Sequence, residues 1–263
     1  MRHLPNLLTL ANLFCGCLAI VCVLNAQPFL YSNDTGNPDI KWNWVYGVQQ
    51  MQWGAVLIFL AAFFDLLDGW VARTLKIFSP IGKDLDSLAD VVSFGVAPSM
   101  IMYKLLWNAV TREPHVTDAA ILSMAPALLI ACFAALRLAR FNVTPGKKGE
   151  FTGMPTPAVG ILIASFALVD WDNPNSWSQY LQYKWVAYGV IALLCFLMVS
   201  NIRFLKLMPA KWAIKYSWPQ AVIVVSALAA IPFLYFSAIP FAFAIYIIVS
   251  LVAPKNKEAV VAS

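Results

Sequence analysis

The sequence contains eight apolar runs of about the length needed to cross a lipid bilayer. A membrane-spanning helix requires about 20 predominantly apolar residues. The runs lie near residues 5–25, 53–73, 87–109, 119–142, 155–171, 183–202, 218–236 and 238–253. With 61% hydrophobic and 12% charged residues, the 263-residue chain carries more apolar surface than one soluble core of this size can bury. We therefore predict an all-α fold, a polytopic membrane helical bundle with about eight transmembrane helices.

The distribution of Lys and Arg predicts which ends of these helices face the cytoplasm, because cytoplasmic loops of membrane proteins are enriched in both residues. With the N-terminus inside, 14 of the 18 basic residues fall in inner segments, and only Lys41, Lys104, Arg112 and Lys184 fall in outer ones. This predicts cytoplasmic N- and C-termini and an inner-membrane protein. We expect one membrane domain over residues 1–253 and a short polar cytoplasmic tail over 254–263.

The second and third apolar runs carry four aspartates, although charged residues inside a membrane are unfavourable. On each helix the aspartates recur at helical spacing together with small residues, so each set shares one face. The first set is Asp65, Asp68, Gly69, Ala72 and Arg73, and the second is Gly82, Asp86 and Asp90. A turn at Ser79-Pro80 would make the two helices an antiparallel hairpin with facing stripes. Asp84 lies off both stripes, and we expect it in a solvated loop.

Clustered carboxylates in a dry site need cations or protons. Oxygen ligands suit hard divalent ions such as Mg²⁺, Mn²⁺ or Ca²⁺, and two such ions can bind a pyrophosphate. Gly69 and Gly82 leave room for a flat nucleotide to approach the backbone. A single intramembrane Asp often only makes interhelix hydrogen bonds, but four at this spacing favour a functional site. The predicted active site therefore lies on the second and third helices, at about 53–109, facing the cytoplasm.

The segment from Phe64 to Asp90 fits the pattern D-x2-D-G-x2-A-R-x8-G-x3-D-x3-D at every fixed position. In this it resembles the CDP-alcohol phosphatidyltransferases. Further segments resemble the phosphatidylserine synthase branch of that family, namely LPNLLTLANLFCG, DSLADVVSFGVAPS, RLARFN, FTGMPTPA and MVSNIRF. The resemblance implies transfer of a phosphatidyl group from CDP-diacylglycerol to L-serine, with phosphatidylserine and CMP as products. It also implies contact with membrane lipids and a homodimer; no nucleic-acid partner is expected.

The resemblance also implies roles for single residues. Asp65, Asp68 and Asp86 match ligands of a centre with two divalent cations, Mg²⁺ or Mn²⁺ with Ca²⁺ also compatible. Asp90 matches the fourth carboxylate, which touches one metal and serves as the general base. The positions implied to contact the CDP group are Asp68, Gly69, Arg73 and Gly82, together with Asn6 and Thr9 at the start of the first helix.

Serine presents a carboxylate, for which Arg is a suitable partner. Arg137 and Arg140 lie three residues apart near a cytoplasmic helix end, so they share a helix face. Ser93, Thr152 and Thr156 supply hydroxyl groups that we also expect near the acceptor.

Three alternatives follow from the same residues. The first is the same reaction class with another acceptor, such as glycerol 3-phosphate or an inositol phosphate, which would call for a denser basic pocket. The second is a cation transporter, which predicts acidic residues spread through several helices. The third is a membrane prenyltransferase, against which the D-G-x2-A-R stripe argues. The concentration of the aspartates in one hairpin favours the phosphatidyltransferase.

Overall fold

The computed structural model describes most of the apolar part of the chain. The described residues are 4–26, 28–32, 42–46, 48–75, 80–111, 121–143, 151–172, 177–200, 202–204, 230 and 234–252. The expected tail over 254–263 and most of the expected span over 218–236 lie outside these residues.

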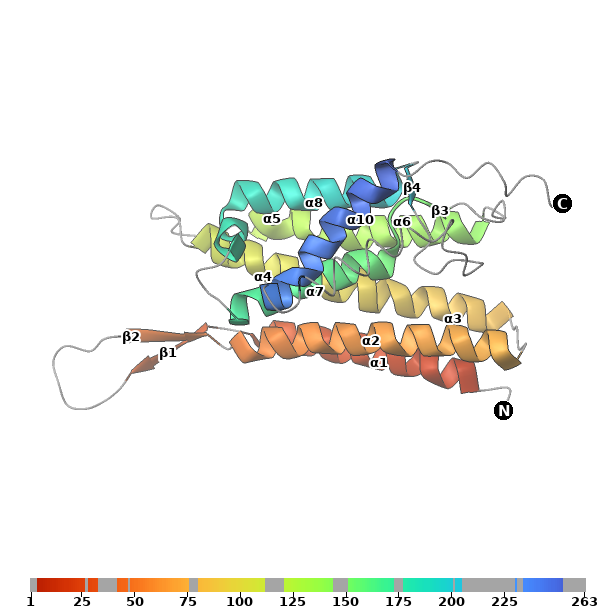
Figure 1. The fold of residues 1–263 in the computed structure, drawn as a ribbon. Coiled ribbons are helices and arrows are strands. Elements are labelled where there is room, and N and C mark those ends of the chain that lie inside the picture. The colour runs from red at the N-terminus through yellow and green to blue at the C-terminus, as the bar shows by residue number, and fades with distance from the viewer. Residues whose placement is uncertain are drawn as a thin grey trace.

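Helices account for most of the described chain. Their bounds are α1 Leu4–Asn25, α2 Val48–Leu75, α3 Pro80–Asp90, the π-helix η1 Val91–Val96, α4 Ala97–Thr111, α5 Ile121–Met124, η2 Ala125–Leu128, α6 Leu129–Val143, α7 Thr156–Asp172, η3 Trp177–Gln182, α8 Lys184–Val199, η4 Tyr235–Ser237 and α10 Ala238–Val252. Two short antiparallel ladders lie at the ends of the bundle, outside its helical core (Figure 1). They pair β1 Pro28–Ser32 with β2 Trp42–Tyr46, and β3 Phe151–Thr152 with β4 Arg203–Phe204.

Within the described residues, four helical segments are long and apolar enough to cross a membrane. They are Leu4–Asn25, Gln50–Leu75, Ile81–Thr111 and Ile121–Val143. The third joins α3, η1 and α4 into one continuous helix, and the fourth joins α5, η2 and α6. The chain is thus an integral membrane protein with a helical bundle, as the apolar runs predicted.

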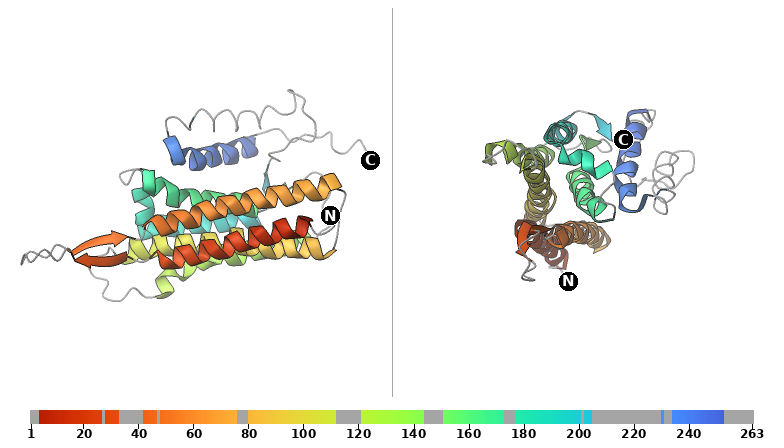
Figure 2. Two further views of the ribbon diagram at one scale, coloured as in Figure 1. Left: turned by 90° about the horizontal axis from the view of Figure 1, so that it is seen from below. Right: turned by 90° about the vertical axis from the view of Figure 1, so that its left-hand side faces the viewer.

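The described part of the chain also holds three apolar helices that are shorter than the predicted spans. They cover Thr156–Val169, Lys184–Val199 and Tyr235–Ser250. Every residue of α7 from Leu162 to Val169 is buried, so α7 forms the centre of the bundle rather than a lipid-facing surface. The helix α10 lies at the periphery of the described bundle (Figure 2).

Helices α1 and α2 lie side by side, and α1 also packs against α3 and η1 (Figure 1). The expected α2–α3 hairpin therefore has α1 as a shared packing partner. The start of α1 and the ends of α2 and α6 lie at one end of the bundle, where α3 begins (Figure 1). This arrangement gathers the polar segments of the chain at that end.

The close approach of α1 to η1 depends on Gly16. A Cβ atom at residue 16 would lie 2.8 Å from the Cα atom and 3.0 Å from the Cβ atom of Ser93. Real Cβ atoms do not tolerate backbone at such distances, so a larger side chain must push the two helices apart. The π-helix that carries Ser93 begins directly after Asp90, and π-helical turns are frequent at functional sites.

Replacing Gly16 by Ala is expected to lower the free energy of unfolding by about 1–3 kcal/mol. The matched control is Gly189→Ala on α8, where nothing lies within 4 Å of the position that an added Cβ atom would occupy. Because Ala is the better helix former, the control should be neutral or slightly stabilising. Thermal unfolding in detergent measures the stability of both variants. Equal unfolding temperatures for the two would contradict the close packing of α1 on η1.

The segment before α7 is held in one conformation by backbone hydrogen bonds. The Gly153 N–H donates to the Ile202 carbonyl at 2.9 Å, and the Met154 N–H donates to the Leu197 carbonyl at 3.0 Å. Gly153 has a φ of 79°, a conformation that favours glycine. The segment therefore fixes the position at which Thr156 starts α7.

Candidate active site

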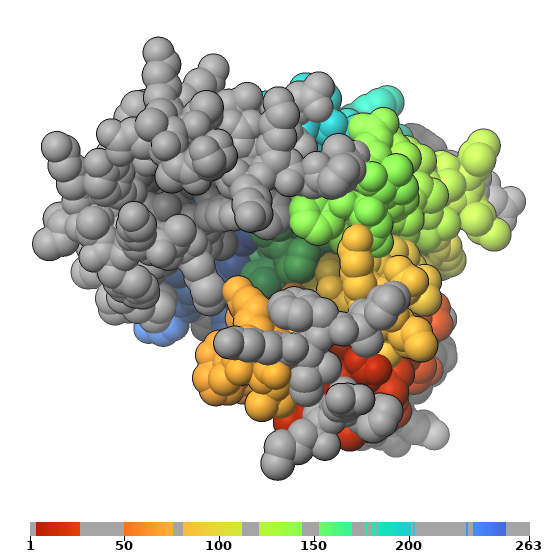
Figure 3. All heavy atoms as spheres, turned by 90° about the vertical axis from the view of Figure 1, so that its right-hand side faces the viewer, coloured from red at the N-terminus to blue at the C-terminus, as the bar shows by residue number. Residues whose placement is uncertain are grey.

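Three carboxylates converge where α2 passes α3. Oxygen atoms of Asp65, Asp68 and Asp86 all lie within 4.8 Å of one another. The two facing stripes were predicted from the sequence, and the structure brings these three members of them together. The end of the molecule that carries them is recessed between α2, α3 and the end of α6, with α7 deeper in the recess (Figure 3).

The donor set of this cluster fits a divalent cation. Asp86 Oδ1 is buried and has no hydrogen-bond partner among the described residues. Clustered carboxylates of this kind repel one another unless a cation lies between them. Oxygen-only ligation favours hard ions, so the cluster can bind a divalent metal.

Asp90 lies one helical turn beyond Asp86 on α3 and is 7% exposed. It stands beside the three-carboxylate cluster rather than in it, but it interacts electrostatically with all three members. Its carboxylate Oδ1 accepts a hydrogen bond of 3.4 Å from Asn12 Nδ2 on α1. Asp90 is therefore held by a side chain from another helix while remaining adjacent to the cluster.

Helix α1 supplies polar contacts to both acidic stripes. The Thr9 hydroxyl lies 2.8 Å from Asp68 Oδ2 and 3.1 Å from the Pro5 carbonyl, and it is positioned to donate to either. Asp68 is 6% exposed, so this contact lies inside the bundle. Asn6 is half-buried one turn before Thr9.

Sequence reasoning missed Asn12. It is fully buried, it contacts Asp90, and its Oδ1 atom has no partner among the described residues. A signal was available, because Pro5, Thr9, Asn12 and Gly16 recur at helical spacing as the buried face of an otherwise apolar helix.

The positions on α2 and α3 that were expected to contact CDP lie near the C-terminal end of α2 and the N-terminal end of α3. Gly69 and Arg73 follow the aspartates on α2, and Gly82 precedes Asp86 by one turn on α3. The Arg73 Nε–H donates to the Gly69 carbonyl at 2.8 Å, so this side chain folds back along its own helix. Asp84 was expected in a solvated loop. It is exposed, but it belongs to the helix α3.

The two arginines of the expected acceptor site differ in their surroundings. Arg137 on α6 is 9% exposed, and its Nη1 donates a 2.9 Å hydrogen bond to the Thr156 hydroxyl at the start of α7. It also lies within electrostatic range of Asp90. Arg140 is exposed. The structure therefore brings Arg137 and Thr156 together near the aspartates and leaves Arg140 at the surface.

Two other hydroxyl residues were expected near the acceptor. Ser93 is fully buried, and its hydroxyl donates to the Asn12 carbonyl at 3.0 Å, which joins η1 to α1. Thr152 lies in β3 opposite Arg203, and its side chain is outside the described part of the structure.

A polar link fixes α3 relative to α6. Asn142 Nδ2 donates to the Ser87 hydroxyl at 2.8 Å, and Lys83 Nζ lies 3.5 Å from the Asn142 carbonyl. Because α3 carries Asp86 and Asp90 while α6 carries Arg137, the link helps to set the distance between the acidic cluster and this arginine.

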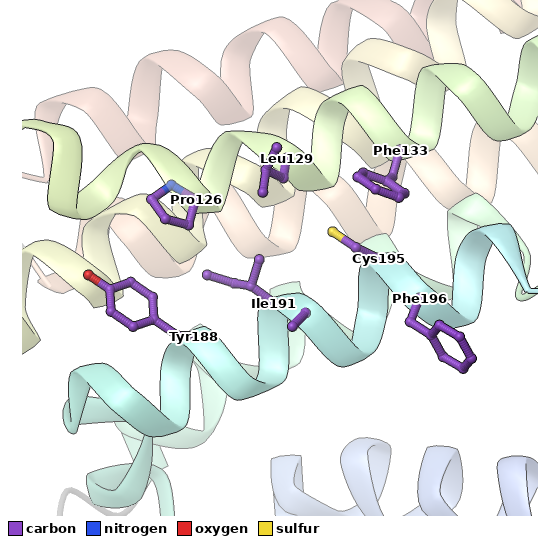
Figure 4. Close-up of a pocket in the computed structure, with 8 residues that line it drawn as sticks. Pro126, Leu129, Phe133, Tyr188, Ile191, Cys195 and Phe196 are labelled. Atoms are coloured by element: carbon purple, nitrogen blue, oxygen red, sulfur yellow. The ribbon is translucent and has the colours of Figure 1, made fainter.

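An apolar groove lies elsewhere, between the η2–α6 segment and α8 (Figure 4). It encloses about 360 Å³ and has no charged lining residue. Leu129 and Phe133 line one side, and Tyr188, Ile191 and Cys195 line the other. It has none of the groups that the acidic cluster offers for chemistry.

Comparison with known proteins identifies the family to which a chain with this acidic cluster belongs. The model of the CDP-alcohol phosphatidyltransferase family matches residues 2–254, and the chain belongs to this family. Two bacterial relatives carry the name CDP-diacylglycerol–serine O-phosphatidyltransferase. The Helicobacter pylori J99 protein is 33% identical over 213 residues, 80% of this chain and 75% of the relative. The Bacillus subtilis protein is 32% identical over 206 residues, 78% of this chain and 90% of the relative.

An archaeal relative extends the comparison to another lipid class. The Methanothermobacter thermautotrophicus protein named archaetidylserine synthase is 37% identical over 151 residues, 57% of this chain and 56% of the relative. The names of all three relatives refer to serine or to its lipid product.

Proposed function

We propose that the protein transfers the phosphatidyl group of CDP-diacylglycerol to L-serine, giving phosphatidylserine and CMP. The observation that carries this proposal is the convergence of Asp65, Asp68 and Asp86 within 4.8 Å inside a membrane bundle of this family. The serine-specific names of the relatives support the choice of acceptor.

Asp65, Asp68 and Asp86 would hold two divalent cations, Mg²⁺ or Mn²⁺ with Ca²⁺ as a further candidate, and Asp90 would touch one of them. When bound, such ions neutralise a pyrophosphate and the departing phosphate oxygen. Gly69, Arg73 and Gly82 would contact the CDP group from α2 and α3. Thr9 orients Asp68 from α1, and Asn6 would approach the nucleotide from the same helix.

Asp90 would act as the general base. It takes the proton of the serine hydroxyl while the serine oxygen forms a bond to the phosphorus that carries diacylglycerol. The bond from this phosphorus to the bridging oxygen of the pyrophosphate breaks, and CMP leaves with that oxygen. Asn12 holds one oxygen of Asp90, which leaves the other oxygen for the proton. Positioning of this kind supplies most of the catalysis in phosphoryl transfer.

Arg137 would bind the serine carboxylate. A buried guanidinium that hydrogen-bonds Thr156 has its planar fork fixed, which suits a carboxylate. Arg140 would act at the membrane surface. Ser93 would act through the segment of η1 that it joins to α1, and Thr152 remains a proposed acceptor residue at the start of the segment that precedes α7.

Replacing Arg137 by Ala is expected to raise the KM for serine by about tenfold or more, because a hydrogen bond to a charged group contributes about 1.5–3 kcal/mol. Arg140→Ala, three residues away and exposed, is the matched comparison and should change this KM less than about threefold. Steady-state kinetics at saturating CDP-diacylglycerol measures both. An unchanged serine KM in Arg137→Ala would remove Arg137 from the acceptor site.

The remaining expectations concern the protein in its membrane. We propose eight spans forming one membrane domain over 1–253, with both termini and the acidic cluster on the cytoplasmic side of the inner membrane, and with a homodimer as the assembly. The excess of Lys and Arg in the sequence segments that are predicted to lie inside supports this orientation.

The experiment that tests the function is CMP release by the purified protein from CDP-diacylglycerol and Mn²⁺ or Mg²⁺, with L-serine, glycerol 3-phosphate or inositol phosphate as acceptor. Release stimulated by serine alone is expected. Stimulation by another acceptor would keep the reaction class and overturn the acceptor, whereas no release with any acceptor would favour the cation transporter.

A further inference from the structure

The π-helix η1 touches three helices at short range through three consecutive buried residues. At each contact a Cβ atom added to the glycine of the pair would lie within 3.1 Å of a carbon atom of its partner. The pairs are Ser93 with Gly16 of α1, Phe94 with Gly160 of α7, and Gly95 with Ala134 of α6. Contacts this close leave no room for larger side chains, so they fix the level of each helix relative to η1.

A layer of polar residues lies one helical turn from these contacts, on the side of the acidic cluster. Its members are Asn12 on α1, Asp90 at the end of α3, Arg137 on α6 and Thr156 on α7. Helix α1 begins and α6 ends at the end of the bundle where α3 begins, and α7 follows β3 on the same side (Figure 1). A spacing of three or four residues from the contacts therefore places all four at one level. Each of them is at most 9% exposed.

Two hydrogen bonds use part of this polar layer. Asn12 Nδ2 donates to Asp90 Oδ1 at 3.4 Å, and Arg137 Nη1 donates to the Thr156 hydroxyl at 2.9 Å. Two buried atoms of the layer have no partner among the described residues, namely Asn12 Oδ1 and Arg137 Nε. A buried polar group without a partner is unfavourable. The layer that contains the proposed general base therefore offers one unpaired acceptor and one unpaired donor to a ligand.

A zwitterionic amino acid carries the groups that match these two atoms. Its carboxylate accepts hydrogen bonds, and Arg137 is already proposed to bind it. Its ammonium group has three N–H donors and needs an acceptor. The carboxylates of the acidic cluster are a poor choice, because the divalent cations proposed to lie among them repel another positive charge. The unpaired acceptor of the polar layer is the neutral amide oxygen of Asn12.

We propose that Asn12 determines the specificity for an amino-acid acceptor: its Oδ1 accepts a hydrogen bond from the ammonium group of the acceptor while its Nδ2 holds Asp90. The inference rests on the proposed function, in which Arg137 binds the carboxylate of serine and Asp90 takes the proton of its hydroxyl. The three polar groups of serine then meet three residues of one layer. Both unpaired atoms are covered, so neighbouring side chains must shift when the acceptor enters, as is common on binding.

The test compares L-serine with 3-hydroxypropanoate, which has the same hydroxyl and carboxylate groups but no ammonium group. CMP release by the purified full-length protein is measured with CDP-diacylglycerol and Mn²⁺. For the wild type, kcat/KM should be about ten- to a hundredfold higher with serine, the usual contribution of a hydrogen bond to a charged group. In Asn12→Leu, which keeps a side chain of similar size without the amide, this ratio should fall below about threefold.

Two further variants keep the test specific. Ser165→Ala is the matched control, because it also removes a buried polar group from the bundle, a hydroxyl that donates to the Leu162 carbonyl of its own helix at 2.6 Å. It should keep the wild-type ratio. Asn12→Ala replaces Asn12→Leu if the larger side chain prevents folding, and it should lose the ratio in the same way.

The outcomes separate this inference from the proposed function. Serine-stimulated CMP release with a wild-type ratio in the Asn12 variants would overturn the inference and leave the proposed function intact, since Asn12 would then only hold Asp90. A wild type that uses both acceptors equally would also overturn the inference. A wild type that releases no CMP with serine would overturn the proposed function, and the inference with it.

Discussion

Replacing Asp90 by Asn is expected to lower kcat for CMP release by about 10²–10⁴-fold, the usual contribution of a general base. The substitution keeps the shape of the side chain and removes its ability to take the serine proton. It also keeps an oxygen that can accept the hydrogen bond from Asn12. Because Asp90 stands beside the three-carboxylate cluster and would touch only one of the two cations, binding of a divalent cation by Asp65, Asp68 and Asp86 should persist.

Two measurements make this prediction specific. Single-turnover CMP release at saturating serine reports the chemical step, and titration with Mn²⁺ followed by electron paramagnetic resonance reports metal binding. Asp84→Asn is the matched control, since Asp84 is an exposed carboxylate on the same helix, and it should retain wild-type activity. Normal turnover by Asp90→Asn with metal binding intact would exclude Asp90 as the base.

Replacing Asp86 by Asn is expected to abolish stabilisation of the protein by Mn²⁺ and to lower activity by at least about 10³-fold, because the cluster loses a charged ligand. The stability of the metal-free protein should change in the opposite direction. Asp86 Oδ1 has no protein donor to lose among the described residues, and its negative charge faces two other carboxylates, so removing that charge relieves repulsion. The metal-free variant should therefore unfold at the same temperature as the wild type or at a higher one.

Thermal unfolding with and without the cation tests this pair of opposite effects. A cation present at about 100 times its dissociation constant stabilises the wild type by about 2.7 kcal/mol, whereas the variant should show no such shift. A wild-type response of Asp86→Asn to Mn²⁺ would remove Asp86 from the metal site. A large loss of stability without metal would show instead that Asp86 is part of the structural core.

The acidic cluster could be predicted from the sequence because helical periodicity fixes which residues share a face. Asp65 and Asp68 on one helix and Asp86 on the next were expected to meet, and they do. Periodicity within a helix does not reveal which other helix packs against that face. The contributions of Thr9 and Asn12 depend on the packing of α1 against both α2 and α3, which only the structure describes.

The acceptor side was less predictable for the same physical reason. Arg137 and Arg140 lie three residues apart on α6, and only the structure shows that Arg137 is buried and Arg140 is exposed. Asp84 was expected in a loop because Ser79-Pro80 indicated a turn, but Pro80 begins α3, a position at which proline favours a helix.

The central expectation is that the protein transfers a phosphatidyl group to serine at its acidic cluster. Incorporation of radiolabelled L-serine into lipid by the purified protein tests that reaction most directly, with CDP-diacylglycerol and Mn²⁺ supplied and each omitted in turn. We expect the label to enter a lipid that co-migrates with phosphatidylserine only when both are present, and to be lost on chelation of the cation. Label that stays in the aqueous phase under all conditions, from a folded protein that binds CDP-diacylglycerol, would contradict the proposed function.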